Sequence, residues 1–206
     1  MMDLQVPVIG ILRGVEADFF KQLMVPSFEA GLQAIEVTMN TVGGLGMIRD
    51  NRDNVPVGKY LGMGTIRNVE EARLALEAGA MFLVTPNFNP EVVEFAAARS
   101  IAVISGALTP TEVYAAHSSG AVMVKVFPCS AMGGPGYIKE LRGPYDDIPL
   151  VAVGGVSLEN VQEYLAAGAS GVGVSSALFG RDALAEKDIN KLTANVKKFI
   201  DYCRQD

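Results

Sequence analysis

The chain has 206 residues, of which 50% are hydrophobic and 19% are charged, a composition that favours one packed domain over residues 1–206 and argues against disorder. Its formal net charge of −6 argues against nucleic acid or an anionic membrane surface as a partner. No signal peptide or membrane span is expected, and Cys129 and Cys203 suit neither a disulfide framework nor a metal site, so we expect a metal-free protein of the reduced cytoplasm.

Short apolar runs of strand length alternate with helix-like segments along the whole chain. In chain order, these runs begin at Pro7, Ala34, Tyr60, Met81, Ile101, Val122, Pro149 and Ser170. Apolar runs separated by segments of helical periodicity indicate parallel strands joined by helices.

The segments between the runs carry signals for helix ends. Asn68, Asn89 and Ser157 stand where a side chain can cap the first turn of a helix. Glycine closes several of these segments, where it can adopt the left-handed conformation that ends a helix; these glycines are Gly31, Gly79, Gly120 and Gly168.

Eight strand–helix units can form either a closed barrel or an open doubly wound sheet. The units are regular, and no dinucleotide-binding fingerprint follows the first strand. We therefore predict a single-domain (β/α)₈ (TIM) barrel with a parallel eight-stranded sheet, with the open sheet as the alternative.

Three of the predicted strands carry a charged residue, namely Arg13, Glu36 and Lys125. A barrel interior is normally filled with branched apolar side chains, so a charge there needs a partner or a function. Lys125 alone among the eight lysines lies within an uninterrupted apolar strand. Burial lowers the pKa of an amine and makes it a better nucleophile toward a carbonyl. Glu36 could move the protons that such chemistry requires.

These charged residues also have structural explanations. Lys125 could extend outward between helices or form a structural ion pair, and Glu36 could be the partner that keeps it charged. The sequence alone does not decide between these explanations and a catalytic pair.

Glycine and serine mark the ends of the last two predicted strands. Gly154 and Gly155 follow the seventh strand, and Ser176 follows the eighth. Such turns bring backbone N–H groups close to an anion, and barrels often bind phosphate after strands seven and eight. At other strand ends, Thr65 could donate to a carboxylate or start a helix, and Phe127 could line a pocket or pack. Cys129 is a further candidate for the pocket wall.

Taken in order, these motifs resemble the class I aldolases of 2-keto-3-deoxy-6-phosphogluconate and 4-hydroxy-2-oxoglutarate, a family that includes the 6-phosphogalactonate enzymes. The resemblance covers nearly the whole chain. It rests on ILRG, IEVTMNT, GMGT, VTPN, VKVFP and the Val-Gly-Gly turn, which contain Arg13, Glu36, Thr65, Pro86, Lys125 and Gly154 in that order.

The resemblance implies a cofactor-free lyase that uses Lys125 as the Schiff-base residue and Glu36 as the general acid and base. It implies that Arg13 and Thr65, with Pro86 nearby, surround the pyruvyl carboxylate, and that Phe127 lines the site. Gly154, Gly155 and Ser176 would hold phosphate. The implied reaction cleaves a 2-keto-3-deoxy-6-phospho sugar acid to pyruvate and glyceraldehyde 3-phosphate, and the implied assembly is a homotrimer.

Two departures bear on the substrate. The gluconate-type enzymes usually have Arg where this chain has Asn40, and Thr where it has Val153. Both departures, and the run FPCSAMGGPGYIK, look more like the galactonate type. Three alternatives stay open. One is an aldolase that forms pyruvate and glyoxylate from 4-hydroxy-2-oxoglutarate, and another is a non-covalent phosphosugar isomerase or epimerase, for which Lys125 would be dispensable. The third is a catalytically silent phosphate-binding barrel or structural subunit, which would form no pyruvate adduct.

Overall fold

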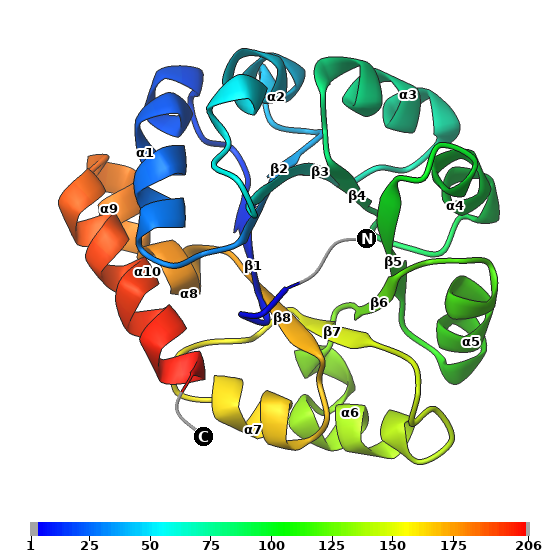
Figure 1. The fold of residues 1–206 in the computed structure, drawn as a ribbon. Helices are drawn as coiled ribbons and strands as arrows, with labels where there is room; N and C mark the ends of the chain where they lie inside the picture. The colour runs from blue at the N-terminus through cyan, green and yellow to red at the C-terminus, as the bar shows by residue number, and fades with distance from the viewer. Residues whose placement is uncertain (1–3, 205–206) are drawn as a thin grey trace.

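The structure, a computed structural model, describes residues 4–204 and contains a closed parallel barrel (Figure 1). The strands follow one another around the barrel in sequence order, and pairing of the eighth with the first closes it. This closure confirms the predicted (β/α)₈ fold over the open sheet. The strands are β1 (Val8–Leu12), β2 (Ala34–Thr38), β3 (Tyr60–Gly64), β4 (Phe82–Val84), β5 (Ala102–Ala107), β6 (Met123–Val126), β7 (Leu150–Val153) and β8 (Gly171–Val174).

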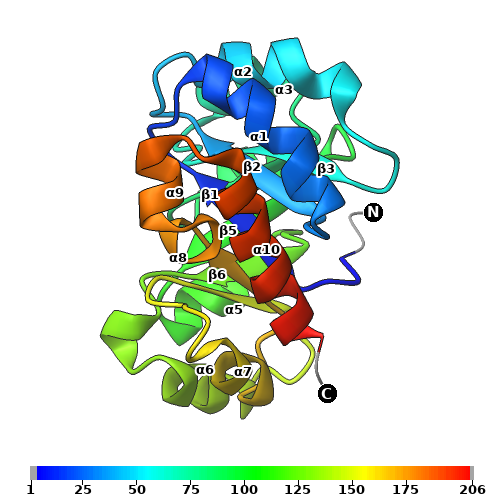
Figure 2. The ribbon, with the colours of Figure 1, turned by 90° about the vertical axis from the view of Figure 1, so that its left-hand side faces the viewer.

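Helices form a ring outside the barrel (Figure 1). Those that connect successive strands are α1 (Ala17–Glu29), α2 (Gly44–Asn51), α3 (Val69–Ala78), α4 (Pro90–Ala97), α5 (Pro110–Ser118), α6 (Pro135–Arg142) and α7 (Val161–Ala166), with short 3₁₀ turns at η1 (Arg52–Asn54) and η2 (Ser130–Met132). After β8 the chain forms α8 (Ser176–Phe179), α9 (Arg181–Glu186) and α10 (Ile189–Cys203), and α10 packs beside α1 (Figure 2).

The predicted end signals hold for most of these helices. The Asn68 side chain accepts a hydrogen bond from the Glu71 backbone N–H, and Asn89 caps α4 in the same way. The four predicted closing glycines all have φ between 99° and 109°, the left-handed region in which a residue without Cβ is favoured.

The start of α7 differs from the prediction. We expected Ser157 to cap a helix beginning at Leu158, but the helix begins at Val161. The Asn160 side chain instead accepts a hydrogen bond from the Ser157 backbone N–H at 2.8 Å and donates one to the Gly155 carbonyl at 2.9 Å. This side chain stabilises a turn after β7, and because of the turn the helix begins three residues later than predicted.

The lower part of the barrel interior is filled by an apolar floor. Alternate strand residues face the interior, and the floor consists of Ile9, Ala34, Phe82, Val84, Ile104 and Val151, all buried; Val153 belongs to the same apolar cluster but also lines the pocket above it. The partly buried Leu4, Ile11, Tyr60, Ala102 and Met123 pack against it. This apolar layer excludes water from below the residues that follow on the same strands.

Above the floor, the interior residues of several strands are glycines. A Cβ added to Gly62 would lie 2.5 Å from the Phe82 ring, and one added to Gly64 would lie 2.5 Å from a Glu36 carboxylate oxygen. At Gly106 the same atom would lie 2.3 Å from the backbone of Pro86. These missing side chains make room in the barrel for larger neighbours, including Glu36.

Candidate active site

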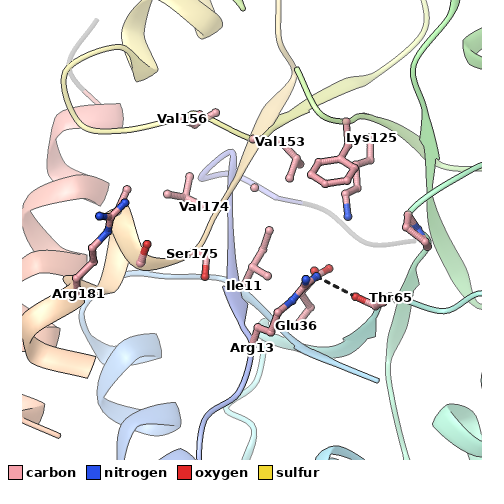
Figure 3. Close-up of a pocket in the computed structure, with 17 residues that line it drawn as sticks. Ile11, Arg13, Glu36, Thr65, Lys125, Val153, Val156, Val174, Ser175 and Arg181 are labelled. Atoms are coloured by element: carbon pink, nitrogen blue, oxygen red, sulfur yellow. Dashed lines mark hydrogen bonds between the residues drawn. The ribbon is translucent and has the colours of Figure 1, made fainter. Parts of the chain in front are cut away.

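A pocket of about 440 Å³ opens at the carboxyl-terminal ends of the strands, within the size range of small-molecule sites (Figure 3). All nine residues predicted for the site line it: Arg13, Glu36, Thr65, Pro86, Lys125, Phe127, Gly154, Gly155 and Ser176. The other lining residues are Ile11, Val153, Val156, Gly173, Val174, Ser175, Ala177 and Arg181. The barrel thus brings together residues that the sequence spreads over more than 160 positions.

Lys125 lies on β6 with only 7% of its surface exposed. In the sheet it stands between Gly106 of β5 and Val151 of β7, and its ammonium nitrogen is 5.1 Å from the centre of the Phe127 ring. Burial lowers the pKa of Lys125 from its ordinary value, and Glu36 and Arg13 act on it with opposite signs. A lowered pKa increases the fraction of neutral, nucleophilic amine.

Glu36 lies on β2, four strands from β6 around the barrel, so it faces Lys125 from the opposite wall, and it is 2% exposed. Burial raises the pKa of its carboxyl group, while the positive charges of Lys125 and Arg13 act in the opposite direction. No ion pair with another described residue fixes Glu36 at short range. A raised pKa makes the carboxylate a stronger base and keeps the carboxyl group protonated to higher pH, which suits a group that both accepts and donates a proton.

Arg13 and Thr65 meet at one end of the pocket. The Arg13 guanidinium donates to the Thr65 hydroxyl at 3.3 Å (Figure 3). Thr65 has a φ of 60°, a left-handed conformation that is unfavourable for a β-branched residue. The chain therefore holds a strained threonine where its hydroxyl and a guanidinium both face the pocket, an arrangement suited to binding a carboxylate.

Gly154 and Gly155 form a tight turn at the other end. Their φ values are 96° and 79°, and a Cβ on Gly155 would lie 2.4 Å from the Ser130 side chain. Within the described residues, the backbone N–H groups of Gly155 and Val156 have no hydrogen-bond acceptor. They are available to an anion in the pocket, as are the nearby hydroxyl groups of Ser175 and Ser176.

Sequence reasoning missed Ser175 and Arg181, which lie on the same side of the pocket (Figure 3). Arg181 starts α9, directly after Gly180. The signal available in the sequence was a cationic residue five positions after Ser176, but only the turn between α8 and α9 brings it to the pocket.

Other polar residues at strand ends do not reach the pocket. The Thr38 and Thr41 hydroxyl groups bond to each other at 2.8 Å, and Thr85 accepts a hydrogen bond from the Gly106 backbone N–H. Cys129, which we considered for the pocket wall, is fully buried and does not line it. Burial raises the pKa of its thiol to about 11, so the thiol is protonated near neutral pH.

The pocket has a different charge from the rest of the protein. The chain carries a net charge of −6, yet the pocket is lined by Arg13, Lys125 and Arg181 against one carboxylate, Glu36. A local excess of cations can bind an anionic substrate although the overall charge opposes it.

Comparison with known proteins identifies relatives of the whole chain. The family model described as KDPG and KHG aldolase matches residues 4–195. The 2-dehydro-3-deoxy-6-phosphogalactonate aldolase of Escherichia coli is 33% identical, and the match covers 95% of each chain. The 2-dehydro-3-deoxy-phosphogluconate aldolase of Pseudomonas aeruginosa is 37% identical over 78% of this chain and 71% of its own.

A solved structure described as native KDPGal is similar throughout. It superimposes with a TM-score of 0.88 at 31% identity, covering 98% of this chain and 97% of its own. The similarity therefore extends over the barrel and all of its strand ends.

Proposed function

The chain belongs to the KDPG and KHG aldolase family, and on that premise we propose that it cleaves its substrate through a Schiff base on Lys125. The protein is a carbon–carbon lyase, a class I aldolase that forms pyruvate and glyceraldehyde 3-phosphate from a 2-keto-3-deoxy-6-phospho sugar acid. The observation that supports the role of Lys125 is its burial beside Glu36 in the pocket, with a lowered amine pKa.

In the first half of the proposed reaction, the neutral Lys125 amine attacks the C2 carbonyl. The carbinolamine that forms loses water to give a protonated imine. The imine then accepts the electron pair of the C3–C4 bond as that bond breaks, and the C4 hydroxyl loses its proton to Glu36. The aldehyde leaves, and an enamine of pyruvate remains on Lys125.

In the second half, C3 of the enamine takes up a proton from Glu36. Hydrolysis of the resulting imine releases pyruvate and restores the amine. Glu36 therefore gains one proton and gives one back in each turnover. A carboxyl group whose burial raises its pKa suits this role better than an ordinary surface carboxylate.

The two ends of the pocket suit the two anionic ends of the substrate. We assign the carboxylate next to C2 to Arg13 and Thr65, because a guanidinium and a hydroxyl can both donate to it. The phosphate is assigned to the turn at Gly154 and Gly155 and to Ser176, where N–H and O–H donors line the pocket. Pro86 and Phe127 supply apolar walls around the reacting carbons.

Within this substrate class we favour the galactonate epimer. Val153 lines the pocket between Lys125 and the Gly154 turn, where an isopropyl side chain offers no hydrogen bond to a substrate hydroxyl. A missing hydrogen-bonding group changes which hydroxyl configuration is stabilised. The cleavage rates of the two purified C4 epimers test this preference, and equal kcat/KM values would contradict it.

The test of the covalent mechanism is trapping with borohydride in the presence of pyruvate, with the adduct located by peptide mass spectrometry. We expect a reduced pyruvyl group on Lys125, and none in Lys125→Met. Lys59→Met is the matched control, because burial also lowers the pKa of the Lys59 amine but this residue lies outside the pocket. A folded protein that forms no adduct with excess pyruvate would sink the Schiff-base mechanism.

We also propose a homotrimer in the cytoplasm. The family resemblance favours this assembly. Both cysteines are free thiols, as a reducing compartment would keep them. Among the described residues, no helix is long and apolar enough to cross a membrane. Light scattering coupled to size-exclusion chromatography measures the assembly directly.

A further inference from the structure

Arg181 is held at the rim of the pocket by a turn that the fold fixes firmly. Gly180, with a φ of 87°, separates α8 from α9, and a Cβ there would lie 2.2 Å from the Asn195 side-chain nitrogen. That same nitrogen donates to the Phe179 carbonyl at 3.1 Å. Asn195 on α10 therefore fixes the backbone immediately before Arg181. The position of this arginine is set by packing rather than by a loose loop.

The charge of Arg181 is not used within the protein. Among residues 4–204, Arg181 takes part in no ion pair and no side-chain hydrogen bond, whereas Arg73 pairs with two glutamates of its own helix, α3. The one carboxylate in the pocket, Glu36, interacts with the charges of Lys125 and Arg13. An unpaired guanidinium that lines a pocket is available to a ligand.

Arg181 and Arg13 lie on opposite sides of the pocket, with Ser175 on the side of Arg181 (Figure 3). A 2-keto-3-deoxy-6-phospho sugar acid has a carboxylate at one end and a phosphate at the other. Arg13 with Thr65 suits the planar carboxylate near Lys125. The second cation is therefore placed for the distant phosphate.

We propose that Arg181 binds the substrate phosphate and is the residue by which this enzyme favours phosphorylated over unphosphorylated 2-keto acids. This inference rests on the proposed function, since it assigns a further residue to the same pocket. Backbone N–H groups and serine hydroxyls are neutral donors that can also serve a water molecule or a sugar hydroxyl. A guanidinium adds charge and two parallel donors, and a sugar acid with a neutral hydroxyl in place of the phosphate offers no anion for them to bind.

The experiment compares two substrates in three variants. Values of kcat/KM are measured for 2-keto-3-deoxy-6-phosphogalactonate and for 2-keto-3-deoxygalactonate, the same sugar acid with a neutral hydroxyl in place of the phosphate. In Arg181→Gln we expect the ratio of the two values to fall about 10- to 100-fold, because one charge-assisted contact is lost for the phosphorylated substrate alone. Arg181→Lys keeps the positive charge but loses the two parallel donors of the guanidinium, so its ratio should lie between those of the wild type and Arg181→Gln.

Arg49→Gln is the matched control, because Arg49 is an exposed arginine on α2 that does not line the pocket. Its ratio should equal that of the wild type. Inorganic phosphate serves as a second probe. It should inhibit the wild type competitively, and its inhibition constant should be about 10-fold higher for Arg181→Gln.

The outcomes separate this inference from the proposed function. Suppose that the wild type forms the pyruvate adduct on Lys125 but Arg181→Gln leaves the ratio unchanged, or lowers both kcat/KM values equally. Arg181 then does not bind the phosphate selectively, and the aldolase assignment still stands. If the wild type forms no adduct and cleaves neither substrate, the proposed function itself fails.

Discussion

The floor and the upper half of the barrel interior are built from neighbouring residues of the same strands, but they differ in character. On β2, Ala34 belongs to the apolar floor and Glu36, two residues later, faces the pocket. On β6, Met123 packs against the floor and Lys125 lies above it. On each of these strands, a residue that packs in the floor is thus followed two positions later by a residue that can take part in the reaction.

The difference between the two layers shows how one supports the other. The floor keeps water from reaching Glu36 and Lys125 from below. The resulting desolvation raises the pKa of Glu36 and lowers the pKa of Lys125, and both shifts favour the neutral form. A buried charge is costly, and the apolar floor offsets that cost in the stability of the whole barrel. We therefore expect changes in the floor to affect stability and changes in the upper layer to affect activity.

The largest effect is expected from Phe82→Ala in the floor. Phe82 is fully buried, and its ring occupies the space that a side chain at Gly62 would need. Removing the ring leaves a cavity and should lower the free energy of unfolding by about 3–5 kcal/mol. Urea denaturation at one fixed protein concentration measures this loss, with kcat measured in the absence of urea.

The comparison predicts that the folded fraction of Phe82→Ala keeps a kcat within a fewfold of the wild type. A stable variant with a large loss of kcat would instead mean that the floor positions the reacting groups directly. Phe82→Leu, which leaves a smaller cavity, should show the same pattern with a smaller loss of stability.

The next effect is expected from Gly64→Ala in the upper layer. The new Cβ would lie 2.5 Å from one Glu36 oxygen and 2.6 Å from its carboxyl carbon, so the carboxyl group must move. A displaced proton carrier should lower kcat about 10- to 100-fold with little change in KM. Steady-state kinetics on the phosphorylated substrate tests this.

Gly46→Ala is the control for that substitution. Gly46 lies in α2, and an added Cβ meets nothing within 4 Å. Its kcat should be unchanged, and its stability should rise by about 0.5–1 kcal/mol, because alanine is favoured over glycine within a helix. If Gly64→Ala matched this control in kcat, the proposed need for space beside Glu36 would be wrong.

The smallest effect concerns the titration of Lys125. Burial lowers the pKa of its amine from the ordinary value of 10.5. Cyanate carbamylates only the neutral amine, so the carbamylation rate should rise with pH, and the midpoint of that rise should lie below 10.5. The negative charge of Glu36 raises this pKa and the positive charge of Arg13 lowers it. Glu36→Gln should therefore shift the midpoint further down, and Arg13→Met should shift it up.

Peptide mass spectrometry of the Lys125 peptide across a pH series measures both shifts. Shifts of the two variants in the same direction would show that the two charges do not act on Lys125 as the geometry indicates. A wild-type midpoint at the ordinary value would mean that the floor does not desolvate the amine.

Much of this molecule could be predicted from its sequence because the signals are local. The strand positions follow from apolar runs, and the caps at Asn68 and Asn89 follow from side chains that bond to their own helices. Ser157 shows where such local reasoning fails. Its serine-then-apolar pattern looks like a helix start, but the Asn160 side chain bonds to the backbone N–H of Ser157 and to the carbonyl of Gly155, and these two bonds hold a turn instead.

Glu36 and Lys125 could be proposed from the sequence because a charge within an apolar strand is conspicuous wherever the strand lies. Arg181 could not, because an arginine after Gly180 looks like any exposed residue at a helix start. Its place at the pocket depends on Asn195, which lies on another helix and is distant in sequence.

The sequence by itself determined the eight-unit barrel, the family and the charged residues that point to imine chemistry, since periodicity, turn residues and ordered motifs are properties of short segments. Only the tertiary structure decided the dry floor, the glycines that make room for Glu36, and the separation of Arg13 from Arg181. These features depend on which atoms of distant segments occupy the same space, and closing the barrel is what brings those segments together.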